Sequence, residues 1–224
     1  MSRPRGRSGA GRRVSTTGVL LMIAAPSGAG KTSLVNALVA RQPNVHVSVS
    51  YTTRPQRNGE IDGRNYHFVS PEQFLEMGAA NSFLEHAWVF GHNYGTSRND
   101  VIRELDAGHD VVLEIDWQGA RQIRMECPDA LSVFILPPSR VTLLERLRDR
   151  GLDDEAVIRR RTVASVNEMS HFAEFDYVLV NDDFDTAAAE LEAILVAHRQ
   201  GLEAPHPDHG SLIAELLSYD GAIE

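Results

Sequence analysis

Residues 25–32 have the composition of a loop that binds the phosphates of a nucleoside triphosphate. An apolar run at 19–24 precedes the loop and a helical pattern follows it, which is the strand–loop–helix order that such a loop requires. Glycines let consecutive backbone N–H groups turn towards phosphate oxygens, and a helix start favours negative charge. We expect Lys31 to reach the β- and γ-phosphates and the Thr32 hydroxyl to contact Mg²⁺. The expected phosphate-binding residues are Ala25, Pro26, Ser27, Gly28, Ala29, Gly30, Lys31 and Thr32.

One position departs from the usual pattern, because Ala25 stands where the first glycine of such a loop is expected. Alanine still presents its N–H group, so the loop survives if the backbone there has a negative φ. The alternative is a glycine-rich turn that carries an ordinary surface lysine. The strand and the helix on either side favour phosphate binding over that alternative.

The composition limits the class of protein. The 224 residues, 42% of them hydrophobic, suit one α/β core with small insertions. The longest apolar run is too short to cross a bilayer, so no membrane partner is expected. The single cysteine, Cys127, excludes an internal disulfide and a four-cysteine zinc site. It also fits a reducing compartment, so we expect a cytoplasmic protein.

Charge is distributed unevenly along the chain, whose net charge is −9. Residues 1–17 carry five arginines and no acidic residue, so the remainder is strongly acidic. We expect 1–17 to form a disordered tail, since it is rich in Gly and Ser and lacks the apolar centre of a signal peptide. A transit peptide or an RNA-contacting arm is the alternative for this tail. The acidic body argues against nucleic acid as a partner.

Three apolar runs are typical of buried parallel strands. They lie at 111–113, leading into Glu114-Ile115-Asp116, at 133–136 and at 177–180. Helical patterns separate them, at about 97–108, after Pro138 with Ser139 as the N-cap, and at about 186–198. This alternation predicts a three-layer α/β fold with a central parallel sheet and with ligands at the carboxyl ends of the strands.

The stretch from about residue 45 to 99 has a different pattern. Valines at 45, 47 and 49 alternate with polar residues, which predicts a strand with one polar face. Residues 66–69 and 83–89 are candidates for further strands. Ser70, Pro71 and Gln73 have the N-cap, first-turn proline and capping-box pattern of a helix start. We expect a mixed α/β subdomain inserted into the core, and a short amphipathic helix at 212–217.

A second group of residues could hold another phosphate. Arg54 and Arg57 are followed by Tyr66, and two guanidinium groups with a phenol suit a dianionic phosphate. The alternative is a solvated turn that contains two arginines. Farther along, Glu85 supplies a carboxylate on an expected strand, and residues 93–97 form an expected loop that contains Tyr, Gly and Thr.

Together these segments resemble guanylate kinase over nearly the whole chain. The phosphate-binding loop alone is shared by many families, whereas block 50–60 combined with Glu85 and Tyr94 is far more specific. The matching segments are 26–33, 50–60, 63–68, 83–85, 93–97, 114–119, 136–139 and 180–183. The resemblance implies a P-loop kinase domain at 18–199, between the tail at 1–17 and a C-terminal extension at 200–224. Its core would comprise 18–47, 101–137 and 164–199, its GMP-binding subdomain 48–100 and its helical lid 138–163.

The resemblance also implies the residues of the GMP site. In that family a serine, a glutamate and an acidic residue bind guanine, which here are Ser50, Glu85 and Glu114. One carboxylate can accept from guanine N1–H and N2–H₂, whereas it repels the bare N1 of adenine, so Glu85 is a sensible reader of the base. The alternative for Glu85 is an edge-strand acid that faces water. Glu114 stands where the family has an aspartate, whose side chain is one methylene shorter. The other implied GMP ligands are Arg54, Arg57, Tyr66, Tyr94 and Thr96. Glu60 would orient one of the arginines.

An acidic residue at the end of a strand is the usual partner of Mg²⁺ in such a site, and here it is Asp116, directly or through water. Strand-end capping is the alternative for Glu114 and Asp116. The lid would place Arg146, Arg150 and Arg161 over the phosphates of ATP. Surface pairing with neighbouring acidic residues is the alternative for the arginines of this region.

The implied reaction is ATP + GMP → ADP + GDP, with dGMP also accepted and Mg²⁺ as the cofactor. Three alternatives stay open. A ribose-bisphosphate kinase on the same fold would not need Ser50 and Glu85 as readers of a base. A non-catalytic peptide-binding module would not need Gly30-Lys31-Thr32 or an arginine-rich lid. RNA binding through the tail is disfavoured by the acidic body, and the sequence leaves the oligomeric state open.

Overall fold

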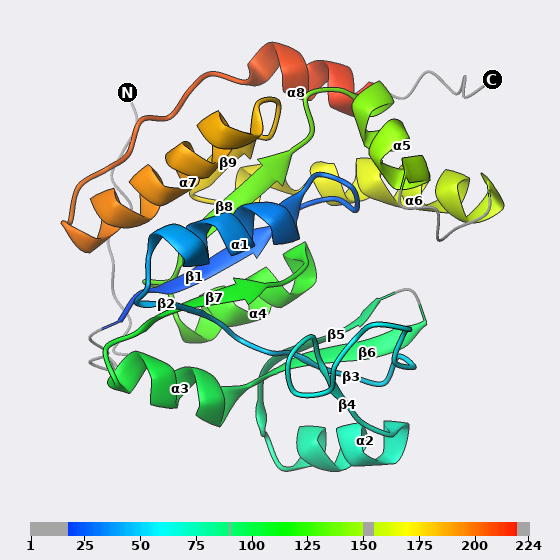
Figure 1. Ribbon diagram of the computed structural model, residues 1–224, viewed down its shortest axis with the longest axis vertical. Coiled ribbons are helices and arrows are strands. Elements are labelled where there is room, and N and C mark those ends of the chain that lie inside the picture. Colours follow the sequence, from blue (N-terminus) through cyan, green and yellow to red (C-terminus); the bar gives the residue numbers. More distant parts are fainter. Residues whose placement is uncertain (1–17, 90, 150–154, 219–224) are drawn as a thin grey trace.

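The computed structural model describes residues 18–89, 91–149 and 155–218. Its centre is a parallel sheet with the strand order β2-β7-β1-β8-β9 (Figure 1). These strands are β1 (Leu20–Ala24), β2 (Val45–Val47), β7 (Asp110–Glu114), β8 (Leu131–Leu136) and β9 (Tyr177–Val180). Every side chain of β1 is buried, because this strand lies in the middle of the sheet between two helical layers.

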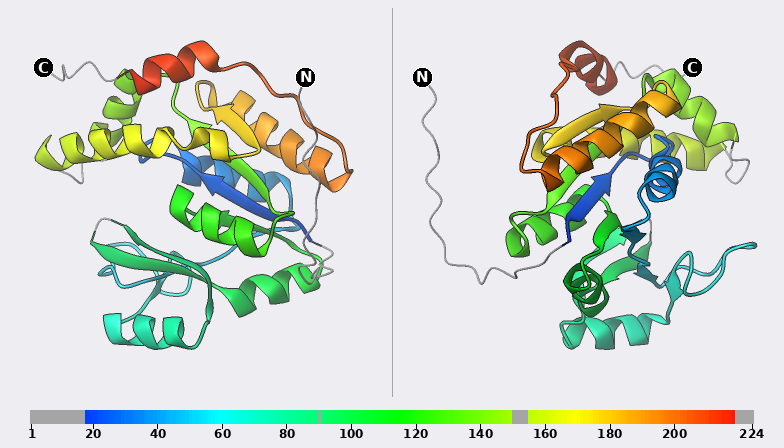
Figure 2. Two further views of the ribbon diagram at one scale, coloured as in Figure 1. Left: turned by 180° about the vertical axis from the view of Figure 1, so that it is seen from behind. Right: turned by 60° about the vertical axis from the view of Figure 1, so that its left-hand side comes forward.

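Helices cover both faces of this sheet, as the two views of Figure 2 show. On one face, α1 (Lys31–Arg41) and α7 (Phe184–Arg199) pack through Leu34, Leu38 and Leu191. On the other face, the apolar cluster includes residues of α3 (Arg98–Asp106), α4 (Trp117–Glu126), α6 (Glu155–Met169) and α8 (Gly210–Leu217). The three-layer α/β fold predicted from the sequence is confirmed.

The inserted segment forms a second sheet below the first in Figure 1, with the order β4-β3-β6-β5. Its strands are β3 (Tyr51–Thr52), β4 (His67–Phe68), β5 (Phe83–Val89) and β6 (His92–Ser97). Helix α2 (Pro71–Ala79) begins with the predicted capping box between Ser70 and Gln73. It packs on the sheet through Phe74, whose ring stacks on Phe83 at 4.4 Å between centroids.

One local prediction was wrong. Residues 93–97 were expected to form a loop, but they lie in β6, which pairs antiparallel with β5. The strand expected from the alternating valines is present as β2, and its apolar face is only partly covered, since Val45 is buried whereas Val47 is 36% exposed. Strand β2 lies at the edge of the central sheet and ends at Val47, so its last residue has no layer to cover it.

The described parts of the segment that links β8 to β9 are mainly helical. Helix α5 (Arg140–Asp149) begins after Ser139, whose hydroxyl accepts from the Thr142 N–H at 3.0 Å as the N-cap pattern predicted. Helix α6 follows and continues to Met169, beyond the predicted end of the lid at 163. Among the described residues, no helix is long and apolar enough to cross a membrane.

Candidate active site

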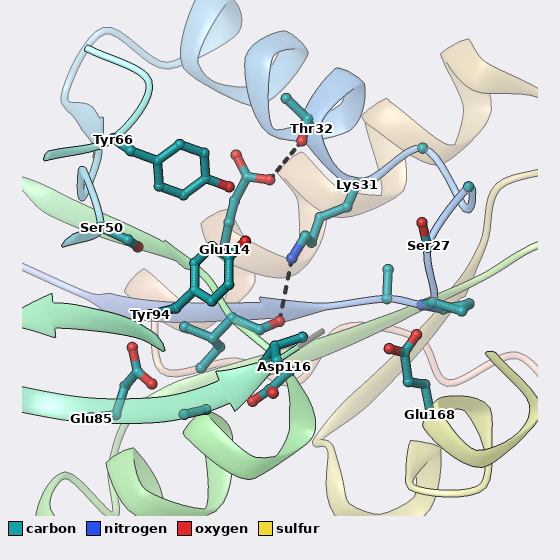
Figure 3. A pocket seen from close by; sticks show the side chains of 17 residues that line it. Ser27, Lys31, Thr32, Ser50, Tyr66, Glu85, Tyr94, Glu114, Asp116 and Glu168 are labelled. Carbon is teal, nitrogen blue, oxygen red and sulfur yellow. Dashed lines mark hydrogen bonds between the residues drawn. The ribbon is translucent and has the colours of Figure 1, made fainter. Parts of the chain in front are cut away.

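A cavity of about 310 Å³ lies between the carboxyl edge of the central sheet and the inserted subdomain. Figure 3 shows Ser27 and Glu168 at one end, Ser50 and Glu85 at the other, and Lys31 between them. The cavity is lined by Ala25, Pro26, Ser27, Gly28, Gly30, Lys31, Thr32, Ser50, Tyr66, Glu85, Ala87, Val89, Tyr94, Glu114, Ile115, Asp116 and Glu168. One continuous space therefore joins the phosphate-binding loop to the buried carboxylate of the subdomain.

The loop after β1 has the geometry that its glycines predict. Gly28 and Gly30 have φ values of 94° and 92°, a region that other residues rarely adopt. Among the described residues, Asn81 is the only non-glycine with a positive φ, so Ala25 meets the condition under which the loop survives. Gly30 is the N-cap of α1, and no side chain caps this helix start. Its N–H groups are suited to receive an anion.

Asn181, at the end of β9, supports the loop from behind. Its Nδ2 donates to the Ala29 carbonyl at 2.7 Å, and a Cβ on Gly30 would come within 2.2 Å of the same nitrogen. Arg146 of α5 donates from Nη2 to the Asn181 carbonyl at 3.1 Å. The Arg146 Nη1 is buried and has no hydrogen-bond partner among the described residues. An orphaned, buried cationic donor beside the loop is suited to an anionic ligand.

Lys31, Thr32 and Glu114 meet at the mouth of the loop (Figure 3). The Lys31 Nζ donates to the Ile115 carbonyl at 3.3 Å. The Thr32 hydroxyl donates to Glu114 Oε2 at 2.8 Å. A hydroxyl and a carboxylate oxygen in contact, beside a phosphate-binding loop, are the hard oxygen ligands that Mg²⁺ prefers. The residues present therefore fit a magnesium ion at Thr32 and Glu114.

Glu85 lies at the other end of the cavity and is only 5% exposed. The pKa of its carboxyl is raised to about 7, mainly by burial and also by the nearby Asp116 charge, although the hydrogen bond from Thr96 and the Lys31 charge oppose this shift. The Thr96 hydroxyl donates to Glu85 Oε1 at 2.6 Å. The second oxygen lies close to α4, since a Cβ on Gly119 would come within 2.7 Å of Oε2.

Asp116 caps the start of α4, because its Oδ1 accepts from the Gly119 N–H at 2.7 Å. The same Gly119 lies beside the Glu85 carboxylate, so two acidic side chains from different elements approach one another there. The capping alternative for Asp116 is therefore observed, although the residue also lines the cavity. Glu114 and Asp116 thus face different parts of the site: one lies beside Thr32, the other beside Glu85.

The expected phosphate clamp is partly assembled. Arg54 is buried, and its Nη2 donates to Glu60 Oε1 at 2.6 Å, which lowers the pKa of Glu60. Its guanidinium carbon lies 5.3 Å from the centre of the Tyr66 ring, and that ring meets Tyr94 edge to face at 5.9 Å. Glu60 Oε2 accepts from the backbone N–H of Arg57 at 2.7 Å, whereas the Arg57 side chain is exposed. Glu60 thus orients Arg54 and the turn that carries Arg57.

The cavity does not include every predicted site residue. Arg150 lies outside the described residues. Arg161 is described and half-buried on α6. The predicted residues that do not line the cavity are Ala29, Arg54, Arg57, Glu60, Thr96, Arg146 and Arg161.

Sequence reasoning missed two residues, Asn181 as the support of the loop and Glu168. Glu168 of α6 lines the cavity beside Ser27 (Figure 3), whose backbone donates a hydrogen bond to the carboxylate. The pKa of Glu168 is raised to about 7, mainly by burial, although this hydrogen bond and the Lys31 charge oppose the shift. Asn181 could have been found, because it follows the strand expected at 177–180 and belongs to the matching segment 180–183. Glu168 gave no signal, because it is one of several polar residues on a helix without a motif.

Comparison with known proteins places the chain in a family. A family model described as guanylate kinase matches residues 17–198. A guanylate kinase from Alkalilimnicola ehrlichii is 58% identical over 200 residues, covering 89% of this chain and 97% of that protein. One from Saccharophagus degradans is 56% identical over 205 residues, covering 92% and 100%. The crystal structure of guanylate kinase from Anaplasma phagocytophilum has a TM-score of 0.69 and 35% identity, covering 82% of this chain and 87% of that one. The chain therefore belongs to the guanylate kinase family.

Proposed function

We propose that this protein transfers the γ-phosphoryl group of ATP to GMP, giving ADP and GDP. The observation that carries the proposal is one continuous cavity, which has an uncapped helix start and Lys31 at one end and the buried Glu85 carboxylate at the other. Two anionic substrates can meet in such a space with their phosphates near Lys31. Membership of the guanylate kinase family supports this activity.

Guanine recognition follows from the chemistry of Glu85. An ionised carboxylate accepts from N1–H and N2–H₂ together, and Ser50, at the same end of the cavity, would supply a hydroxyl for O6. Adenine would face Glu85 with an acceptor instead of a donor. Because dGMP carries the same base edge and the same phosphate, we expect it to be a substrate as well.

We propose that the two acidic residues at the end of β7, Glu114 and Asp116, exchange the roles that the sequence suggested. Glu114 would hold Mg²⁺ together with Thr32, because these side chains are hydrogen-bonded at 2.8 Å. Asp116 would act beside Glu85 at the base, because both approach Gly119. When bound, Mg²⁺ neutralises charge on the phosphate oxygens of ATP.

The chain's own residues do the rest by positioning and charge. The phosphate of GMP is already anionic, so no general base is needed, and the two anions must be brought into line against their repulsion. Lys31 and Arg146 would compensate charge in the transition state, with Arg150 and Arg161 joining them from the lid. Closure of the lid at 138–163 and of the subdomain at 48–100 would exclude water, which otherwise accepts the phosphoryl group.

A coupled assay of ADP release tests the proposal directly. The purified protein, ATP and Mg²⁺ are combined in turn with GMP, dGMP, AMP, CMP and UMP, and with ribose 1,5-bisphosphate. Rapid turnover with GMP and dGMP alone is the expected result. Turnover with the sugar phosphate would favour the alternative kinase, and no turnover with any acceptor would favour a non-catalytic module.

The clamp gives a first prediction about variants. Replacing Arg57 with alanine should raise the KM for GMP by roughly 10-fold or more while leaving the KM for ATP nearly unchanged, since one charge-assisted contact to phosphate is lost. Arg54→Ala should do the same and also lower the melting temperature, because Arg54 is buried and ion-paired with Glu60. Steady-state kinetics with each substrate varied, and thermal unfolding, measure both effects. A selective rise in the KM for ATP would place these arginines in the other subsite.

The exchanged acidic roles give a second prediction. Glu114→Gln should raise the Mg²⁺ concentration needed for half-maximal activity, because one carboxylate charge at the metal is lost. Asp116→Asn should instead raise the KM for GMP and leave the Mg²⁺ dependence nearly unchanged. Mg²⁺ titrations of activity at saturating and at low GMP separate the two effects. The reverse pattern would restore the roles suggested by the sequence.

A further inference from the structure

We propose that His46, Glu104 and His109 form a second binding site, for a divalent transition-metal ion such as Zn²⁺. The Nδ1 atoms of His46 and His109 lie 2.9 Å and 3.0 Å from the same oxygen, Glu104 Oε2. One ligand atom from each residue lies within 4.8 Å of the other two. The two imidazole rings lie 4.1 Å apart between centroids, with an angle of 34° between their planes.

The backbone holds these side chains in place from three separate segments. His46 belongs to β2, Glu104 to the last turn of α3, and His109 to the turn that leads into β7. That turn is fixed by Gly108, which has a φ of 87°, and by hydrogen bonds from His109 N–H to the Glu104 carbonyl and from Asn44 Nδ2 to the Gly108 carbonyl. The convergence is therefore set by the fold, not by three mobile side chains.

Two imidazole nitrogens and one carboxylate oxygen are a usual ligand set for Zn²⁺, which accepts nitrogen and oxygen in four-coordinate sites. The side chains of His46, Glu104 and His109 are 42%, 30% and 33% exposed, so an ion can enter and water can complete the coordination. Without an ion, each Nδ1–H donates to the carboxylate. An ion would bind both Nδ1 atoms, and each neutral ring would then carry its proton on Nε2, with any additional proton released to solvent.

The charges around the cluster leave room for a cation. Glu104 supplies a carboxylate whose Oε2 accepts from both imidazoles. The neighbouring Arg103 approaches only the other oxygen, at 3.5 Å. The pair of His171 with Glu174 differs, because Arg121 donates to both Glu174 oxygens at 2.6 Å and leaves neither for an ion.

The position of the cluster separates it from the catalytic cavity. It lies where β2 and β7 begin, whereas the phosphate-binding loop follows the carboxyl end of β1, at the opposite edge of this parallel sheet (Figure 1). Helix α3 is the segment that returns the chain from the inserted subdomain to the core. A bound ion would join the end of α3 to the edge strand β2, so it should stabilise the folded protein.

Zinc binding to the full chain tests the proposal. Chelator-treated protein is titrated with Zn²⁺ in excess Mg²⁺, which occupies the nucleotide-associated site, and the free ion is followed with a chromophoric chelator. We expect one ion per chain with micromolar affinity, a rise in melting temperature with Zn²⁺, and the visible absorption of low-symmetry Co²⁺ when cobalt replaces zinc. His46→Gln, His109→Gln and Glu104→Gln should each weaken binding by more than the ~10-fold that loss of an outer-shell partner costs.

His198→Gln is the matched control, since it removes an exposed histidine in the last turn of α7. It should bind Zn²⁺ as the parent does. All variants should keep their far-UV circular dichroism and, in Mg²⁺ without Zn²⁺, their phosphoryl-transfer rate, which distinguishes failure of this proposal from failure of the proposed function. Absence of saturable binding by the parent protein would overturn the proposal. Binding that persists in the double variant His46→Gln/His109→Gln would overturn it equally.

Discussion

Lys31→Ala is expected to lower kcat for GMP-dependent ADP formation by ~10³-fold or more, because preorganised charge at the transferring phosphoryl group is lost. The Lys31 ammonium lies at the mouth of the loop, held to the Ile115 carbonyl at 3.3 Å. Alanine suits the first turn of α1, so the fold should persist. Single-turnover kinetics and thermal unfolding measure the two properties separately.

Arg41→Ala is the control, since it removes a cation from the opposite end of α1 and should leave kcat nearly unchanged. Lys31 is also the only lysine in the chain. An amine-reactive reagent should therefore modify the N-terminus and Lys31 alone, and ATP should protect Lys31 while the N-terminus reacts as before. Near-normal turnover of the Lys31→Ala variant would contradict the assignment of residues 25–32 as the phosphate-binding loop.

Glu85→Gln is expected to reverse much of the preference for guanine. One acceptor oxygen becomes an NH₂ donor, which opposes the donors of GMP and can pair with N1 of adenine. A site built to hydrogen-bond one base can discriminate by roughly 10⁴-fold, so the ratio of kcat/KM for GMP to that for AMP should narrow by orders of magnitude. The KM for ATP should barely change. An unchanged ratio would show that guanine is read elsewhere, with Asp116 and Glu114 the next candidates.

The pH dependence of this variant should differ as well. The folded pKa of Glu85 is about 7, above the ordinary value of 4.5, so the native state binds more protons than the unfolded state between these values. The free energy of unfolding therefore falls as pH rises through this window, and the loss is complete above pH 7. Glu85→Gln removes that loss and should be the more stable protein at pH 8, whereas near pH 4 the two should be alike.

The pH dependence of activity should also show the ionisation of Glu85. As pH falls from 8 to 6, protonation of Glu85 in the free enzyme removes an acceptor for guanine, so kcat/KM for GMP should fall. Glu76→Gln, on the exposed face of α2, is the control and should keep the parent profile and stability. A flat profile for the parent protein would contradict the role of an ionised Glu85.

The parts of the fold that could be predicted from the sequence are those whose signal is local. Strands β7 and β8 are buried between two layers, and burial on both faces produces the continuous apolar runs that were recognised. The run of β9 was recognised as well, although this edge strand alternates between buried and half-buried residues. The capping box of α2 is likewise contained in four consecutive residues. Strand β6 gave no such signal: its sequence, His-Asn-Tyr-Gly-Thr-Ser, becomes a strand because β3 and β5 pair with it on either side.

The candidate site divides in the same way. The phosphate-binding loop was predicted from its own motif, whereas the residues of the GMP site were named from the resemblance to guanylate kinase. The sequence did not predict which ligand Glu114 and Asp116 would each face. These two residues are only two positions apart, and their surroundings depend on the packing of Thr32 and α4. Glu168 reaches the cavity only through the packing of α6, which no local pattern encodes.

The central position of β1 also has a consequence for synthesis of the chain. This strand emerges from the ribosome early, and all of its side chains are apolar. Its two neighbours, β7 and β8, appear only after the whole inserted subdomain has been made. The nascent protein therefore carries an apolar strand without its full set of partner strands while residues 25–136 are made, which is about half of the chain. Such a segment is prone to aggregate, because pairing between distant segments is slow and incomplete chains expose it. We expect chaperone demand to fall sharply once translation passes Leu136.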